Sequence, residues 1–227
     1  MTTTVIAIDG YASTGKSTLS KQLAQHLGYT YMDTGYMFRA IGHFALQHNL
    51  VDKGVIDVAE LEKALPGLQF SWKEGKEGQR QMAMNDSVYG EELRTSEISN
   101  LVSMVATIPA VRTHLLRQQR NLSKATSVVM DGRDIGTVVF PNAAHKFFLN
   151  AEPEIRAKRR YAEMQAKGIP ASFEEVLANV IERDRMDSTR TIAPLAKAED
   201  AIEIDTSTMD VKAVFQLLCD HIEGRVL

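Results

Sequence analysis

Cysteine is almost absent from this chain, whose 227 residues contain only Cys219. A single cysteine excludes an internal disulfide and fits a protein of a reducing compartment. Metal sites built from cysteine and histidine are also excluded, because the six histidines are scattered without the spacing of metal ligands. Cys219 itself lies in a C-terminal helical pattern, where a small buried apolar residue is a simpler interpretation than a reactive thiol.

Long apolar runs and an excess of one charge are missing as well. No apolar stretch approaches the length that spans a membrane. Met1 is followed by three threonines rather than by the basic and apolar segments of a signal peptide. With 26 basic and 29 acidic residues the net charge is −3, so nothing attracts the chain globally to nucleic acid or to an anionic membrane. We therefore expect a soluble cytoplasmic protein that binds neither, with any anion site made by local clusters of basic residues.

The sequence does contain a glycine loop between an apolar strand and a helix. The run from Val5 to Ile8 indicates a buried strand, which ends in the turn signal Asp9-Gly10. The pattern Gly10-x-x-x-x-Gly15-Lys16-Ser17 follows, and a helical pattern begins at Thr18-Leu19. This order of strand, loop and helix is the context of a phosphate-binding P-loop. An ordinary glycine turn before a helix is the alternative interpretation.

The chemistry of such a loop is specific, because its backbone N–H groups point at one volume where the helix dipole adds positive potential. Gly10 and Gly15 permit backbone angles that a Cβ forbids. Lys16 would place its ammonium between the β- and γ-phosphates of a nucleotide, and the Ser17 hydroxyl would bind a metal ion. The predicted phosphate-binding residues are Gly10, Tyr11, Ala12, Ser13, Thr14, Gly15, Lys16, Ser17 and Thr18.

Strand and helix patterns alternate along most of the chain. Strands are expected at 4–9, 29–32, 127–130, 146–149 and 201–204, and helices at 16–27, 36–48, 96–106, 110–121, 152–167, 173–188 and 209–223. Ser172 and Glu175 have the spacing of a capping box before the helix at 173–188. This alternation predicts an α/β fold with a parallel sheet flanked by helices on both faces.

Residues 52–93 depart from this alternation. After a short helix at 58–65, alternating segments at 68–72, 80–84 and 87–89 are separated by polar turns at 73–78 and 85–86. The pattern predicts an antiparallel β insertion between helices, which could be a small lobe that closes over a ligand.

Polar residues follow two predicted strands at the edge where parallel sheets bind ligands. Asp33-Thr34-Gly35 ends the second strand, with Arg39 one helical turn further on. The strand expected at 127–130 ends in Asp131, Arg133 and Asp134. A lone arginine at such a place could equally well form a surface salt bridge. Together, however, these residues indicate a site for a second, anionic ligand. Asp131 is also a candidate for the acidic residue that ends a Walker B strand.

The helix at 173–188 starts with an apolar stripe and ends with charge. The stripe reaches Asp184 and Asp187 where apolar residues would continue it, and Arg183, Asp187 and Arg190 lie on one side of the helix. A helix face that changes from apolar to charged residues in this way leaves the core and borders a cleft that contains water. A solvated pair of Arg183 and Asp187 is the competing interpretation.

The helix at 152–167 has four basic residues, Arg156, Lys158, Arg159 and Arg160, close together. Such a run is usually a solvated basic face. In a P-loop protein it could instead be a lid that brings arginines onto a transferring phosphate. Binding of nucleic acid, a third alternative, would need interleaved aromatic residues, which this run lacks.

Together these residues resemble the bacterial cytidylate kinases, which are P-loop nucleoside monophosphate kinases. The resemblance covers nearly the whole chain in the family's order, and the run from Asp131 to Pro141 is its most specific part. It rests on Ile8–Thr18 (IDGYASTGKST), Asp33–Arg39 (DTGYMFR), Arg94-Thr95 with Val111-Arg112, Asp131–Pro141 (DGRDIGTVVFP) and Arg183–Arg190 (RDRMDSTR).

The resemblance implies a P-loop NTPase fold and a monomeric enzyme that transfers the γ-phosphoryl group of ATP to CMP or dCMP with Mg²⁺. It implies a single kinase domain over residues 1–227. Within that domain, 1–35 and 101–227 would form the core, about 36–100 a lobe that binds the nucleoside monophosphate, and about 152–170 a short helical lid.

The family's site residues carry over to matching positions of this chain. Ser103 and Arg112 would read the cytosine with help from Asp134, and Asp187 would hold the ribose hydroxyls. Arg39, Arg133 and Arg190 would neutralise the CMP phosphate, while Arg159 and Arg160 match the lid. The implied catalytic residues are Lys16, Arg133, Arg159 and Arg190, with Ser17 as the metal ligand. The implied CMP-binding residues are Thr34, Arg39, Ser103, Arg112, Arg133, Asp134, Arg183, Asp187 and Arg190.

Four positions depart from the family's pattern. Tyr11 replaces the usual proline of the glycine loop, and Tyr36 replaces the usual alanine. Phe38 replaces a tyrosine and loses any hydroxyl contact, and Met186 lacks the charge of the arginine that is common there.

Two other functions stay open from the sequence. One is a kinase of another small acceptor, such as UMP, AMP or shikimate. The other is a non-catalytic nucleotide-binding module, although ATP binding alone has no need for arginines at 133, 183 and 190.

Overall fold

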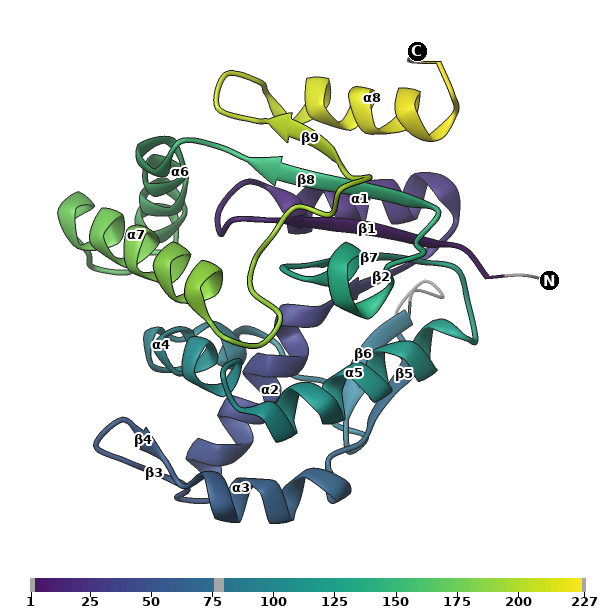
Figure 1. Cartoon of the computed structure of the whole chain (residues 1–227). Helices are drawn as coiled ribbons and strands as arrows, with labels where there is room; N and C mark the ends of the chain where they lie inside the picture. Colours follow the sequence, from purple (N-terminus) through teal and green to yellow (C-terminus); the bar gives the residue numbers. More distant parts are fainter. Residues whose placement is uncertain (1–2, 76–79, 226–227) are drawn as a thin grey trace.

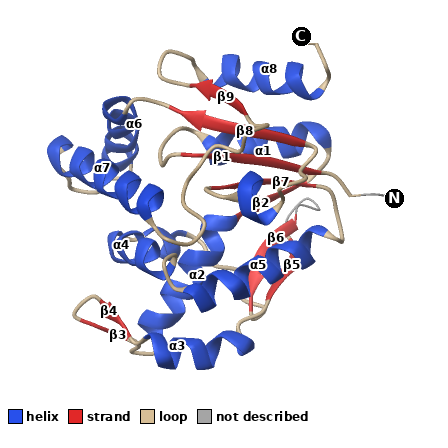
Figure 2. Cartoon of the chain, viewed as in Figure 1, coloured by secondary structure: helices blue, strands red, loops and turns tan. Residues whose placement is uncertain are grey.

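The structure is a computed structural model and describes residues 3–75 and 80–225. Its central sheet has the strand order β2-β7-β1-β8-β9, and every pairing in it is parallel. The strands are β1 (Val5–Gly10), β2 (Thr30–Asp33), β7 (Val128–Gly132), β8 (His145–Asn150) and β9 (Ile202–Asp205). Helices surround this sheet (Figures 1 and 2), which confirms the predicted α/β fold.

Both faces of the sheet are covered because apolar side chains alternate between them along the strands. Ile6 and Ile8 of β1 share a core cluster with α1 (Lys16–Leu27) and α8 (Val211–Ile222). Ala7, between them, belongs to the opposite cluster, which includes α2 (Thr34–Gln47) and α5 (Pro109–Ser123). Strand β1 is therefore buried on both sides, and the glycine loop leaves from its carboxyl end.

Helix α2 begins at Thr34, two residues before the predicted start. Asp33 ends β2 and caps the helix, because its carboxylate accepts a hydrogen bond from the N–H of Tyr36 at 2.9 Å. Strand and helix thus follow each other directly, and the Asp33-Thr34-Gly35 segment is the helix start rather than a separate turn.

The segment between α2 and α5 forms the predicted β-containing insertion. Strands β5 (Phe70–Glu74) and β6 (Arg80–Met84) pair antiparallel as predicted, and part of the turn expected between them, 76–79, lies outside the described residues. The other elements are β3 (Val51–Asp52), β4 (Val55–Ile56), α3 (Val58–Ala64), the short helices η1 (Leu65–Gly67) and η3 (Glu91–Arg94), and α4 (Ser96–Val105).

Two details of the insertion differ from the sequence-based expectation. The strand predicted at 87–89 is wrong, because Ser87 forms only an isolated bridge with Met84. Asn85 and Asp86 make the tight turn between them, with φ angles of 48° and 65°. The hairpin of β3 and β4 was not predicted, since strands of two residues are too short to show a period.

Helices α6 (Pro153–Ala166) and α7 (Phe173–Thr189) pack against each other at one end of the sheet (Figure 1). The capping box of Ser172 and Glu175 at the start of α7 is confirmed. Just after α6, Lys167 pairs with Glu91 of the insertion at 3.0 Å, which links these two parts of the molecule. Among the described residues, no helix is both long and apolar enough to cross a membrane.

Gly10→Ala is expected to destabilise the fold by roughly 3 kcal/mol or more. Gly10 has a φ of 141°, and a Cβ on it would lie 2.0 Å from the carbonyl oxygen of Leu149 in β8. Gly28→Ala is the matched control, because Gly28 also has a positive φ, 67°, but stands in open space. That change should cost only about 1 to 2 kcal/mol of backbone strain. Urea unfolding of both variants measures the difference, and equal losses would contradict a role for the Leu149 contact.

Candidate active site

A cavity of about 390 Å³ lies at the carboxyl ends of β1, β2 and β7, where the chemistry of a parallel sheet is expected. The glycine loop and the start of α1 form one side of it. Residues from α2, α4, α5 and α7 form the other side, together with the segment that follows β7. The structure thus brings together residues that the sequence spreads over more than 170 positions, from Ala12 to Arg190.

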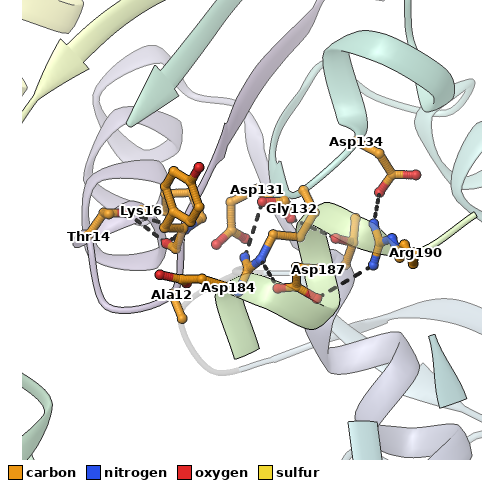
Figure 3. Close-up of polar contacts among 12 residues, drawn as sticks. Ala12, Thr14, Lys16, Asp131, Gly132, Asp134, Asp184, Asp187 and Arg190 are labelled. Atoms are coloured by element: carbon orange, nitrogen blue, oxygen red, sulfur yellow. Dashed lines mark hydrogen bonds and ion pairs between the residues drawn. The ribbon is translucent and has the colours of Figure 1, made fainter. Parts of the chain in front are cut away.

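The glycine loop is built as predicted. Gly15, with a φ of 91°, is the N-cap of α1, and the next residue is Lys16. The Lys16 side chain folds back into the loop, where its Nζ donates to the carbonyl of Tyr11 and to Thr14 Oγ1, the latter at 3.2 Å (Figure 3). Burial, with Arg133 as a second cause, holds the pKa of the Lys16 ammonium well below its ordinary value.

Ser17 is held by the carboxylate at the end of β7. Its hydroxyl donates to Asp131 at 2.7 Å, and the hydroxyl of Tyr31 donates to the other oxygen of the same carboxylate at 3.0 Å. Burial and the nearby charge of Asp33 raise the pKa of Asp131 to about 6. Ser17 and Asp131 both offer oxygen, which is what Mg²⁺ prefers, so their donor set fits that ion. In the described ranges no group of three or more His, Cys, Asp or Glu could hold a metal, so phosphates and water would have to complete its shell.

Two ion-paired clusters form the opposite side of the cavity. Asp187 accepts from Arg133 at 2.8 Å and lies 3.7 Å from Arg190. Asp134 pairs with Arg112. Asp134 also lies 3.6 Å from the same Arg190, as Figure 3 shows. Burial would raise the pKa of Asp187, but Arg133 and Arg190 hold it below its usual value. Asp187 is therefore ionised at neutral pH. Both carboxylates orient the arginines around them.

Three arginines of this wall have donor atoms without a hydrogen-bond partner within the described part of the chain. These atoms are Nε of Arg39, Nε of Arg183 and Nη2 of Arg190. Arg39 still pairs with Asp33 at 2.8 Å. Burial, followed by the charge of Arg133, lowers the pKa of Arg183 to about 10. Buried donor atoms on partly buried cations favour an anion between them. A ligand that accepts those hydrogen bonds removes the free-energy penalty of leaving the donors unpaired.

The remaining predicted acceptor residues have defined places. Thr34 is buried, and its hydroxyl donates to the backbone carbonyl of Asp131 at 2.8 Å. Ser103 of α4 is buried and lines the cavity. The Arg112 guanidinium lies over the ring of Phe38, with its Cζ 5.5 Å from the ring centroid, so Phe38 makes a cation–π contact although it lacks the hydroxyl of the family's tyrosine.

Of the predicted phosphate-binding residues, Gly10, Tyr11 and Thr14 do not line the cavity. Among the predicted catalytic and CMP-binding residues, only Arg159 lies outside its lining. It donates to the hydroxyl of Thr206 at 3.0 Å and to the carbonyl of the same residue. Arg160, its neighbour, does line the cavity together with Glu163 of the same helix. A catalytic role of Arg159 stays a prediction.

Sequence reasoning missed the buried contacts of Arg156. Its guanidinium makes a two-pronged bond to Asp184 of α7, at 3.0 and 2.6 Å, and lies 5.0 Å from the ring centroid of Tyr11. The Arg156 side chain is only 2% exposed, although the basic run around it suggested a solvated face or a lid. The position of Asp184 on the apolar stripe of α7 was the one signal that could have indicated a buried partner.

Comparison with known proteins identifies the family. The cytidylate kinase family model matches residues 6–224. The cytidylate kinase of Flavobacterium psychrophilum is 47% identical over 220 residues, which cover 96% of this chain and 97% of that protein. The cytidylate kinases of Flavobacterium johnsoniae and Phocaeicola vulgatus are each 46% identical over 222 residues, with 97% of this chain covered and 96% and 97% of theirs.

A likeness to solved structures is weaker. The shikimate kinase of Bacteroides thetaiotaomicron aligns with 97% of this chain and 98% of its own, at a TM-score of 0.49 and 14% identity. At that distance it says nothing about the acceptor. The match over residues 6–224 and the relatives at 46–47% identity are decisive: this chain belongs to the cytidylate kinase family.

Proposed function

We propose that this protein transfers the γ-phosphoryl group of ATP to CMP or dCMP and releases ADP with CDP or dCDP. The observation that carries the proposal is a single cavity that joins a glycine loop to a wall of partly buried arginines. A site that only binds ATP needs the loop but has no use for cations across from it, so the arginines indicate a second anionic substrate. Membership of the cytidylate kinase family supports a cytidine monophosphate in that place.

On the donor side, residues 10–18 would hold the triphosphate through backbone N–H groups and the start of α1. Lys16 Nζ lies at the centre of the loop and would donate to the β- and γ-phosphates in place of its present acceptors. Ser17 would be the protein's ligand to Mg²⁺, with Asp131 fixing its hydroxyl. Mg²⁺, when bound, would supply positive charge that offsets the negative charge of the phosphates.

On the acceptor side, Arg39, Arg133 and Arg190 would neutralise the phosphate of CMP. The free donor atoms of Arg39, Arg183 and Arg190 support this role, because phosphate oxygens can accept from all of them. The carboxylates that already bind these arginines would keep them oriented before the substrate arrives, which lowers the cost of ordering them.

The sugar and base would lie beside the two ion-paired clusters. Asp187 would accept from the ribose hydroxyls. Ser103 and Arg112, with help from Asp134, would read the edge of the cytosine, and Thr34 would close the site from the start of α2. The Arg112 and Asp134 pair is almost fully buried, so the direction of its hydrogen bonds is fixed.

The transfer itself would need no general base. The phosphate of CMP is already largely dianionic at pH 7, so its oxygen can attack the γ-phosphorus while the bond to the β-phosphate oxygen breaks and ADP leaves. The obstacle is repulsion between two polyanions. Lys16, Arg133 and Arg190, joined by Arg159 from the lid, would offset that repulsion and stabilise charge on the transferring group. Closure of the lobe and lid would exclude water, which would otherwise accept the phosphoryl group.

Coupled ADP release with a panel of acceptors tests this function. With ATP and Mg²⁺ present, we expect turnover with CMP and dCMP, and kcat/KM lower by roughly a hundredfold or more for AMP and shikimate. Faster turnover with UMP, AMP or shikimate would replace the acceptor. Binding of ATP without any acceptor-dependent ADP would indicate a non-catalytic module instead.

CMP is also expected to raise the thermal stability of the protein. At a hundred times its Kd, a ligand of the folded state adds about 2.7 kcal/mol, which for a chain of this size means a rise in Tm of roughly 5 to 10 °C. Differential scanning fluorimetry with CMP, and with shikimate at the same concentration as the control, measures this shift. A shift with ATP and none with CMP would contradict an acceptor site for CMP.

We also infer that the enzyme acts as a monomer in the cytoplasm, with residues 36–100 as the acceptor lobe and 152–170 as the lid. The single cysteine fits a reducing compartment. Size-exclusion chromatography with light scattering tests the monomer.

A further inference from the structure

Asp9 is a buried carboxylate that has no part in the reaction described above. It is the last residue but one of β1, directly before Gly10, and it is 5% exposed. One of its oxygens accepts from the N–H of Ile135 at 2.9 Å, and the other accepts from the N–H of Gly136 at 2.7 Å. Both oxygens are therefore used by backbone groups that lie far along the chain.

Those two N–H groups open a π-helical turn, η4 (Ile135–Val139). The residue before it, Asp134, does not cap the turn with its own side chain, because its carboxylate is engaged by arginines of the acceptor wall. At the other end, Arg120 donates to the last two carbonyls of the turn, both at 2.9 Å. Turns of this kind are rare and occur most often beside functional sites.

Only two residues, Arg133 and Asp134, lie between the end of β7 and η4. Asp9 contacts the chain immediately before and immediately after Arg133 and Asp134. Its backbone is paired with Gly132 in the ladder of β1 and β7, and its side chain holds the first two N–H groups of η4. The same residue leads into the glycine loop, so it determines how far the acceptor residues stand from the donor loop.

We propose that Asp9 is a positioning residue of the acceptor site, which holds the turn that carries Arg133 and Asp134 at a fixed place beside the glycine loop. Asp9 does not line the cavity, so it acts through these two residues and is not itself catalytic. The proposal rests on the proposed function, because it assigns Arg133 and Asp134 to the binding of CMP.

The electrostatics of Asp9 support a role other than stability. Burial raises the pKa of Asp9 to about 6, even though the two backbone hydrogen bonds lower it. The folded chain then binds the proton more tightly than the unfolded chain, so stability falls as the pH rises from about 4 to about 6. At pH 7 the ionised carboxylate opposes folding. Because the ionised Asp9 carboxylate lowers the stability of the fold, we expect its hydrogen bonds to η4 to serve the function of the protein.

The first test is Asp9→Asn. The amide keeps one oxygen to accept from one backbone N–H but turns an NH₂ group toward the other, so η4 loosens at its start. We expect KM for CMP to rise about tenfold, while KM for ATP changes less than about threefold, because the ladders with β7 and β8 keep the backbone of β1 in place. Tm should not fall, since a buried charge is removed together with the hydrogen bond.

A second variant, Gly136→Ala, moves the same turn and leaves the charge of Asp9 intact. A Cβ on Gly136 would lie 3.1 Å from Cδ of Lys146, a buried side chain whose Nζ is tied to Asp200 at 2.7 Å. Because Lys146 cannot easily give way, the turn must shift by a few tenths of an ångström. We expect KM for CMP to rise again, with KM for ATP nearly unchanged.

Asp210→Asn is the control. Asp210 also accepts from a backbone N–H at a helix start, that of Ala213 at 2.8 Å, but at α8, outside the cavity lining. The Asp210→Asn variant should have a slightly lower Tm and unchanged KM values for CMP and ATP. If KM for CMP and for ATP change equally, or not at all, in the Asp9 and Gly136 variants, the proposal is overturned. A selective effect of Asp9→Asn alone also overturns it, because charge and not position would then be the cause. A wild-type protein without CMP-dependent ADP release would instead refute the proposed function.

Discussion

Lys16→Met is expected to lower kcat by about a thousandfold while the protein stays folded. Removal of one preorganised donor to developing charge typically costs about a hundred- to a thousandfold in rate. Lys16 stands at the upper end of that range, because its charged group lies at the centre of the loop and is 5% exposed. Steady-state ADP release at saturating CMP and ATP measures the effect.

Stability provides an independent readout for the same variant. The unfolded chain binds the Lys16 proton more tightly than the folded chain, since burial lowers the pKa of this ammonium, so the charged group opposes folding at pH 7. Lys16→Met should therefore keep or raise Tm. Lys21→Met is the control, because Lys21 lines the outer part of the cavity over the Tyr31 ring and should lose less than about threefold. A kcat like that of the wild type in Lys16→Met would refute the donor role of the glycine loop.

Arg183→Met is expected to lower kcat/KM for CMP by about two orders of magnitude and to leave KM for ATP within about threefold. Arg183 lines the cavity, and its Nε has no hydrogen-bond partner among the described residues. A guanidinium whose buried Nε is unpaired is stabilised chiefly by an anionic ligand that accepts its hydrogen bond. Its removal thus weakens the acceptor and leaves the glycine loop untouched.

The matched control lies two residues further along the same helix. Arg185 is exposed, and among residues 3–75 and 80–225 its one ion pair is with Glu182, at 2.6 Å, so Arg185→Met should leave both KM values unchanged. Tm should not fall in Arg183→Met, because burial already lowers the pKa of this guanidinium to about 10 and its charge opposes folding. Equal losses for CMP and ATP in Arg183→Met would move this residue out of the acceptor site.

The parts of the site that the sequence predicts well are those with local causes. The glycine loop follows from the conformational freedom of Gly10 and Gly15 and from a helix that starts at Lys16. The place of Arg133 at the ligand-binding edge follows from the rule that parallel strands end at one edge, and the shared side of Arg183, Asp187 and Arg190 follows from the helical repeat. Neither rule needs any information about distant packing. The contact between Arg133 and Asp187, which are 54 residues apart, is implied only by the resemblance to the family.

The parts that escape prediction have distant causes. Residues 135–139, Ile-Gly-Thr-Val-Val, have the composition of a strand, yet they form a π-helical turn because Asp9 and Arg120 hold its two ends. Arg156 lies in a run of basic residues, but contact with Asp184 buries it. In each case the decisive partner is 18 or more residues away, where no periodic pattern can indicate it.

The place of β1 in the sheet also governs how the molecule assembles. Its neighbours are β7 and β8, so Val5 pairs with Val128 and Ile6 with His145. Pairings between such distant segments close long loops, and the entropy of closure makes sheets of this topology slow to fold. During synthesis the glycine loop therefore waits without its supporting strands until more than half of the chain has emerged. A nucleotide is therefore not expected to bind and stabilise the chain during the early steps of folding. Chaperones that cover β1 in that interval should raise the yield of active enzyme.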